Sequence, residues 1–189
     1  MPCPATTTQS RICGSCIADS PSFNRTFCAF AYVSPVNLLI REFKNGHNLV
    51  FGKVMAQVLA KKYSATLTNR PPPHLLLPVP LHKKRLKLRG FNQAAEIAQV
   101  ISDICHIKTN TRICTRDRDT DDQKSLPANR RKHNVDHVFT LNRSLDGYRV
   151  AIVDDVITTG STVTALADLL KQKGASSIEV IALARTPKR

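Results

Sequence analysis

The sequence predicts an α/β fold with a mostly parallel central sheet flanked by helices, and two observations lead to this prediction. Short apolar runs rich in β-branched residues alternate along the chain with segments of helical spacing, the order that builds βαβ units. At 189 residues the chain is long enough for one sizeable core and a small appendage. We therefore expect residues 1–28 to form a small cysteine-containing segment and residues 29–189 to form one α/β domain.

The first half of this domain is expected to hold two strands separated by two helices. Residues 27–33 and 75–80 are short apolar runs of strand length, and prolines end the second one. Residues 36–43 and 51–63 have apolar side chains at helical spacing. The three prolines that end residues 66–73 predict a connector between the last helix and the next strand.

The second half continues the alternation. Helices are predicted at 91–105 and at 163–173, and Gly174 ends the later one. Residues 116–134 contain almost no apolar side chain and mix both charges densely, which predicts a long loop. Strands are predicted at 112–115, 138–141, 148–153 and 178–184.

The segment from Val150 to Thr162 carries the most chemical information. Four apolar residues predict a strand buried on both faces, and the adjacent carboxylates of Asp154 and Asp155 follow it. A turn rich in hydroxyl groups and N–H groups then leads into the next helix, and it consists of Thr158, Thr159, Gly160, Ser161 and Thr162. Such a turn at a helix start is typical of a phosphate cradle. Carboxylates beside it suit sugar hydroxyls, so the segment indicates a ribose phosphate site.

The competing interpretation of the two carboxylates is an acidic turn after a strand. We consider it the weaker one because two carboxylates beside a buried run are costly without a partner. The net charge of +14 allows two kinds of partner, a phosphorylated small molecule or nucleic acid. Residues 83–89 are mostly basic and are compatible with a solvated helix face or with either partner. Aromatic residues are sparse, which gives little support to base stacking.

Three ordered motifs resemble one protein family. The segment Val150 to Thr162 is similar to the motif that binds phosphoribosyl pyrophosphate (PRPP) in type I phosphoribosyltransferases. Residues 79–94, which include Arg89-Gly-Phe-Asn-Gln93, resemble the hallmark segment of the ComF/GntX branch, named for DNA uptake and competence. Residues 40–44 and the polar loop from 123 to 134 are also similar to that branch. The resemblance covers nearly everything from Phe27 to Thr186 and implies the type I phosphoribosyltransferase fold.

The resemblance implies roles for individual residues. Asp154 and Asp155 would hold the ribose hydroxyls, and the turn from Thr158 to Thr162 would hold the 5-phosphate. Leu81, His82 and Lys83 would form a short loop that contacts pyrophosphate. His82 is equally compatible with a purely structural role. Mg²⁺ is the cofactor that accompanies PRPP in this family, and it prefers oxygen ligands.

The family chemistry requires few reacting side chains. The anomeric carbon loses pyrophosphate through a cation-like sugar, so the protein mainly positions the reactants and neutralises the leaving group. The resemblance places Lys124 and Arg130 or Arg131 on a flap that closes over pyrophosphate and excludes water. With Asp154 and Asp155, we take Lys124 and Arg130 as the candidate catalytic residues.

The cysteines leave a zinc site open. Cys13 and Cys16 have the spacing of a metal knuckle, and Cys3 is a candidate third ligand. The ComF family often carries a four-cysteine zinc module ahead of the transferase domain, and here its first pair is incomplete. Cys28 lies in an apolar run, where a buried thiol is the commoner interpretation. Cys105 and Cys114 are also expected in the core.

Two classes of function follow. The leading hypothesis is a Mg²⁺-dependent transfer of ribose 5-phosphate from PRPP to an acceptor that the sequence does not identify. A regulator that senses PRPP would share the pocket without turnover. The alternative class is a non-catalytic accessory protein for DNA uptake or recombination that binds single-stranded DNA, a helicase or other competence proteins. We expect a cytoplasmic protein without a signal peptide or membrane span, and an oligomer is compatible with the sequence.

Overall fold

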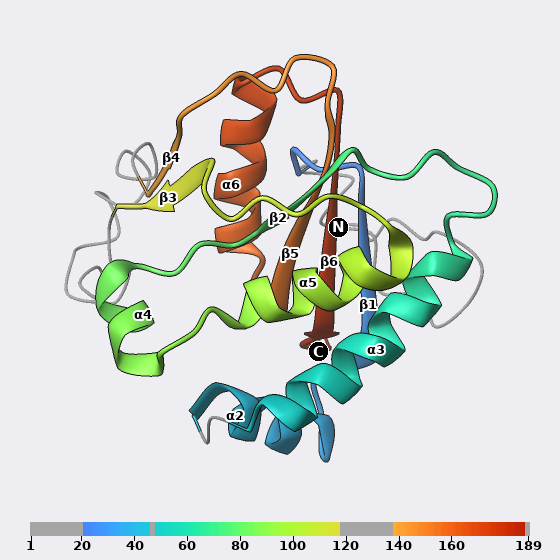
Figure 1. Cartoon of the computed structure of the whole chain (residues 1–189), viewed down its shortest axis with the longest axis vertical. Coiled ribbons are helices and arrows are strands. Elements are labelled where there is room, and N and C mark those ends of the chain that lie inside the picture. The colour runs from blue at the N-terminus through green and yellow to red at the C-terminus, as the bar shows by residue number, and fades with distance from the viewer. Residues whose placement is uncertain (1–20, 46–47, 118–137, 188–189) are drawn as a thin grey trace.

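The computed structural model of the protein describes residues 21–45, 48–117 and 138–187. Strands and helices alternate along the chain, as Figure 1 shows. In chain order they are β1 (Arg25–Ala31), α2 (Val36–Asn45), α3 (Leu49–Ala65), β2 (Leu75–Pro78), α4 (Lys83–Arg89), α5 (Gln93–Cys105), β3 (Cys114–Arg116), β4 (Phe139–Leu141), β5 (Arg149–Ile157), α6 (Ser161–Gln172) and β6 (Ser177–Arg185).

The central sheet has four strands in the order β1-β6-β5-β2, and every pair is parallel. The carboxyl ends of all four strands therefore lie at one edge of the sheet, where open α/β folds bind ligands. Strands β3 and β4 form a separate antiparallel pair. Helix α2 lies below the carboxyl ends of β5 and β6 in Figure 1.

Helices cover both faces of the sheet and bury two cores. Val150 and Ile152 of β5 share one core with α6, whereas Ala151 and Val153 share the other with α3 and α5. This alternation follows from the two-residue period of a strand. A strand that is apolar on both faces was predicted from the sequence, and the structure confirms it.

The predicted α/β architecture is correct, and three details of it were not fully predicted. Strand β5 continues to Ile157, so Asp154 and Asp155 lie within the strand instead of following it. Strands β3 and β4 pair with each other outside the main sheet. The basic segment at 83–89 forms the short helix α4, which has no buried residue and ends at Gly90 in the left-handed conformation.

Strand β1 begins at Arg25 and pairs with β6, so the sheet starts before the predicted boundary at residue 28. Residues 1–20 lie outside the described part of the chain, and a separate segment there stays a prediction. Within the described residues, no helix is both long and apolar enough to cross a membrane.

Candidate functional site

The two adjacent carboxylates lie near the carboxyl edge of the central sheet. Asp154 and Asp155 are consecutive residues of β5, three and two residues before its last residue, Ile157. The N–H of Asp155 donates a 2.8 Å hydrogen bond to Asp154 Oδ1. Asp155 Oδ2 forms a 2.9 Å ion pair with Lys44 Nζ, and only 13% of the Asp155 side chain is exposed. Helix α2 thus brings a cation to the acidic pair.

Burial changes the protonation of this pair. Burial, and next the charge of Asp155, raise the pKa of Asp154 from 3.8 to about 7. The N–H of Asp155 and the charges of Lys44 and Arg116 act in the opposite direction. Near neutral pH Asp154 therefore takes up or releases a proton readily. The two carboxyl groups can accept hydrogen bonds from sugar hydroxyls or bind a cation.

The turn after β5 has the local geometry of an anion cradle. Gly160 has φ 85°, a conformation that favours glycine, and it precedes the first residue of α6. The hydrogen bond from Thr164 N to Gly160 O (2.9 Å) is the one that closes the first turn. The N–H groups of residues 161–163 therefore lie at the open, electropositive end of the helix. The hydroxyl oxygens of Thr159 and Ser161 are 3.1 Å apart and exposed side by side.

The loop between β2 and α4 lies beside the acidic pair. Pro78 at the end of β2 is in register with Val153, next to Asp154. Val79 N continues this pairing with a 2.9 Å bond to Val153 O, and the Asn92 side chain holds Val79 O at 3.1 Å. Leu81, His82 and Lys83 follow directly, so the structure brings this predicted loop to the same edge as the acidic pair and the cradle.

Three basic residues near the acidic pair were not predicted from the sequence. Lys44 pairs with Asp155, and the charge of Arg116 acts on Asp154. Arg185 ends β6 in register with Ile157 and is only 3% exposed. A signal existed for two of them, because Lys44 ends a segment that resembles the family and Arg185 ends an apolar strand. For Arg116 we find no sequence signal.

Several predicted residues lie outside the described part of the chain. These are Lys124 and Arg130 of the expected flap and the candidate zinc ligands Cys3, Cys13 and Cys16. In the described residues, no group of three or more His, Cys, Asp or Glu side chains is arranged to hold a metal. Cys28 lies in β1, where burial raises the pKa of its thiol to about 12, as expected for a core cysteine.

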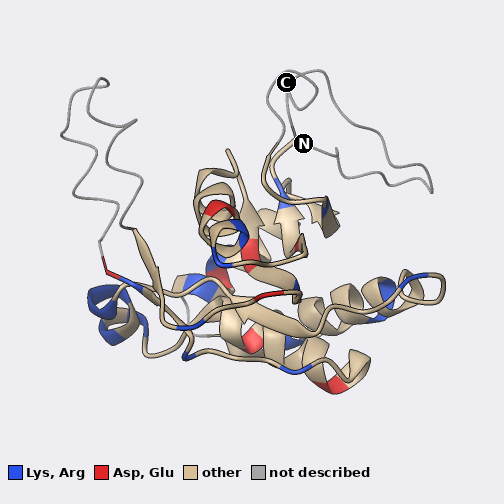
Figure 2. Cartoon of the chain, turned by 90° about the horizontal axis from the view of Figure 1, so that it is seen from above, with Lys and Arg blue, Asp and Glu red and all other residues tan. Residues whose placement is uncertain are grey.

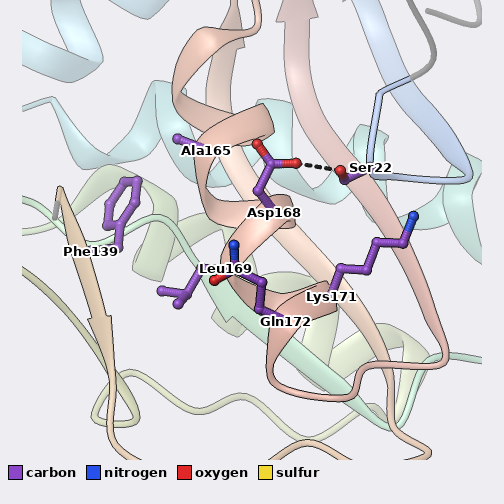
Figure 3. A pocket seen from close by; sticks show the side chains of 7 residues that line it. All are labelled: Ser22, Phe139, Ala165, Asp168, Leu169, Lys171 and Gln172. Carbon is purple, nitrogen blue, oxygen red and sulfur yellow. Dashed lines mark hydrogen bonds between the residues drawn. The ribbon is translucent and has the colours of Figure 1, made fainter. Parts of the chain in front are cut away.

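The cavity drawn in Figure 3 is distinct from this edge. It has a volume of about 560 Å³ and follows the outer side of α6, and Ser22 donates a hydrogen bond to Asp168 at its wall. None of the predicted PRPP-binding residues lines it. The chemistry predicted from the sequence therefore lies at the open carboxyl edge of the sheet and not in this hollow.

Comparisons with known proteins identify the family of the chain. Residues 86–189 match the model of the phosphoribosyl transferase domain, which is more than half of the chain. The chain is 33% identical over 176 residues to DNA utilization protein YhgH of Escherichia coli K12, which covers 92% of this chain and 78% of that protein. It is 34% identical over 178 residues to competence protein F of Haemophilus influenzae, with the same coverage. The chain belongs to the ComF/YhgH family.

This ComF/YhgH chain has the α/β type I phosphoribosyltransferase fold, with its parallel sheet flanked by helices. Solved structures with some likeness include a purine phosphoribosyltransferase of Pyrococcus horikoshii, at 21% identity and a TM-score of 0.41 over 69% of this chain and 70% of that one. Another is the glutamine PRPP amidotransferase of Bacillus subtilis, at 18% identity and a TM-score of 0.49 over 84% of this chain and 31% of that one.

Proposed function

We propose that the protein binds PRPP together with Mg²⁺ at the carboxyl edge of its sheet and transfers ribose 5-phosphate to an acceptor. The observation that carries this proposal is the convergence of three elements at one edge. The acidic pair of β5, the cradle before α6 and the loop after β2 come from separate parts of the chain, and each suits a different part of the donor.

The residues present fit the donor and its metal. Asp154 and Asp155 offer oxygen acceptors for the two ribose hydroxyls, and the residues from Thr158 to Thr162 offer N–H and hydroxyl donors for the 5-phosphate. Oxygen atoms are the ligands that Mg²⁺ prefers, and Mg²⁺ bound with the donor would help to neutralise pyrophosphate. The acidic pair already forms an ion pair with Lys44, so it tolerates a cation beside it.

In the reaction the bond from the anomeric carbon to pyrophosphate breaks, and pyrophosphate leaves with the electron pair. A new bond then forms between that carbon and a nucleophilic atom of the acceptor. The carboxylates at the ribose orient the sugar and favour its developing positive charge. Lys83, and Lys124 with Arg130 on the expected flap, would stabilise the negative charge of the leaving group.

Calorimetry tests the binding part of this proposal. PRPP with Mg²⁺ should bind the wild-type chain, and Asp155→Asn should weaken binding by about tenfold or more because it removes a charged acceptor. The matched control is Asp103→Asn on the exposed side of α5, which should bind normally. Absence of heat with the wild type, or equal affinity in Asp155→Asn, would refute the PRPP site.

Release of pyrophosphate tests the transfer. The protein is incubated with PRPP, Mg²⁺ and a panel of nucleobases, and the release of pyrophosphate is measured. Release that depends on one acceptor, and that is lost in Asp155→Asn, supports a transferase. Tight PRPP binding without release by any acceptor would instead favour a regulator that senses PRPP.

A second candidate function is binding of single-stranded DNA, and helix α4 favours it. This helix has no buried residue, five of its seven residues are basic, and Leu88 is 82% exposed. Figure 2 shows the basic residues of α4 gathered at one end of the molecule. Such a surface suits a phosphate backbone, and DNA utilization and competence are what the names of the relatives state.

A salt titration tests this candidate. Replacing Lys84, Arg85 and Lys87 with Gln should weaken DNA binding and reduce the slope of log K against log salt by up to about 2. Replacing Lys53 and Lys61 of α3 is the control, because these exposed lysines lie on another helix. Binding that is weak in the wild type and unchanged in the α4 variant would exclude α4 as a DNA surface.

A further inference from the structure

The opposite, amino-terminal edge of the sheet holds a cavity lined by basic side chains. It has a volume of about 220 Å³, and three arginines line it, namely Arg25, Arg70 and Arg149. Among the residues that line it, Glu179 is the sole acidic one. The cavity therefore has an excess of positive charge, and it is separate from the edge where the acidic pair lies.

Strand register explains why these side chains meet. Arg25 of β1 is in register with Glu179 of β6, and Arg149 of β5 is in register with Ser177 of β6. Residues in register on parallel strands share a face, as do residues two apart on one strand. All four side chains therefore lie on the face that α3 covers, and the two arginines flank β6 from either side.

Arg70 is held by contacts within the protein. Its Nη1 forms a 3.1 Å ion pair with Glu179 Oε2, and its Nε and Nη2 donate to the backbone and hydroxyl oxygens of Thr66 at 3.2 Å. The Tyr63 hydroxyl donates a 2.5 Å hydrogen bond to Glu179 Oε1. The one carboxylate of the cavity is thus neutralised by Arg70, and it does not neutralise the other two arginines.

The other two arginines retain unused donors. Arg149 donates from Nε to Pro72 O at 3.0 Å, and its terminal nitrogens have no hydrogen-bond partner in the described part of the chain. The side chain of Arg25 is exposed and forms no hydrogen bond or ion pair with a described residue. The two strands that carry them are about 10 Å apart, so both guanidinium groups can reach one small ligand between them.

We propose that this cavity binds a small phosphorylated anion, of the size of pyrophosphate or a sugar phosphate, between Arg25 and Arg149. Guanidinium groups bind phosphate oxygens with paired, charge-assisted hydrogen bonds, which matches the unused donors. The small volume favours a phosphate group over a drug-sized ligand. The site is independent of the proposed PRPP site, because six residues of β5, about 20 Å, separate Arg149 from Asp155.

Nuclear magnetic resonance of the full chain tests this site, because it reports each position separately. Inorganic pyrophosphate is titrated without metal, and backbone amides are followed at residues 25, 149 and 177 and at residues 158–162. We expect the first group to shift with its own saturation curve. Arg25→Gln and Arg149→Gln should each raise the dissociation constant from that curve about tenfold or more. The dissociation constant from the second group should change by less than about twofold.

Arg112→Gln is the matched control, since Arg112 is exposed and does not line the cavity, and it should change neither group. The spectra also show whether each variant is folded. The proposal would be overturned if the amides at the amino edge did not shift in millimolar pyrophosphate. It would also be overturned if they shifted as much in a variant that carries both Arg25→Gln and Arg149→Gln as in the wild type. A larger shift with a single-stranded oligonucleotide at equal phosphate concentration would overturn it as well. Failure of the PRPP site would appear separately, as unmoved residues 158–162 with PRPP and Mg²⁺.

Discussion

Asp154→Asn should stabilise the protein at alkaline pH and have little effect on stability in acid. The pKa of Asp154 is raised from 3.8 to about 7 by burial and by the charge of Asp155. An acid whose pKa is raised on folding holds its proton more tightly in the folded state. Ionising it therefore destabilises the fold, and this cost appears as the pH rises above about 4 and is complete above about 7.

The size of the effect follows from the two pKa values. Each pH unit between them corresponds to about 1.4 kcal/mol, so the full cost is at most about 4 kcal/mol. Asn removes the ionisable group and keeps the shape, so the gain in unfolding free energy should grow from near zero at pH 4 to a few kcal/mol at pH 8.5.

Urea denaturation followed by circular dichroism, at several pH values between 4 and 8.5, measures this difference. The control is Asp103→Asn on the exposed side of α5, whose stability difference from wild type should not vary with pH. A difference for Asp154→Asn that is independent of pH, or a variant less stable than wild type at pH 8.5, would refute the reasoning.

Three further substitutions test other contacts. Lys44→Gln removes a charge that lowers the pKa of Asp154, so the midpoint of the pH-dependent cost described above should move to higher pH in the same denaturation series. Arg70→Met leaves Glu179, which is 6% exposed, without its cation. The free energy of unfolding, measured by urea denaturation, should fall by about 2–4 kcal/mol, and a fall below about 1 kcal/mol would contradict a neutralising role for Arg70. Gly52→Ala brings a methyl group within 2.3 Å of the Phe43 ring. The overpacking should lower the free energy of unfolding by about 1–2 kcal/mol, and so lower the Tm, even though Ala has the better helix propensity.

The elements of the fold could be predicted where the signal is local. The apolar part of β5 and the turn after the strand are encoded in one continuous segment, so apolar length and turn composition were sufficient to find them. The extension of the strand through Asp154 and Asp155 to Ile157 was not predicted, because those carboxylates interrupt the apolar run. Helix α4 was foreseen only as one interpretation of the basic segment, a solvated helix face, because it buries no side chain and leaves no hydrophobic period to detect. It ends instead through a backbone bond from Gly90 N to Leu86 O, 2.8 Å long.

The charges around the candidate site could not be predicted in the same way. Lys44 and Asp155 lie far apart in the sequence, and only the packing of α2 below the strand ends brings them within 2.9 Å. The basic cavity at the amino edge depends on the register of β1 and β5 against β6, which a single sequence does not fix. Both features are properties of the assembled sheet, and the local sequence carries little information about them.

A carboxyl group lies near each edge of the sheet, and the two differ in how their charge is compensated. Glu179 at the amino edge accepts hydrogen bonds from Tyr63 and Arg70 on Oε1, and its Oε2 forms a 3.1 Å ion pair with Arg70, so its charge is paired within the fold. Asp154 at the carboxyl edge accepts one N–H, from Asp155, and its pKa stays raised to about 7. A buried carboxylate with few hydrogen-bond or charged partners lowers the stability of the fold, so a purely structural role gives no reason to keep one. A carboxylate that must bind sugar hydroxyls has to keep its acceptors available, and Asp154 meets that requirement.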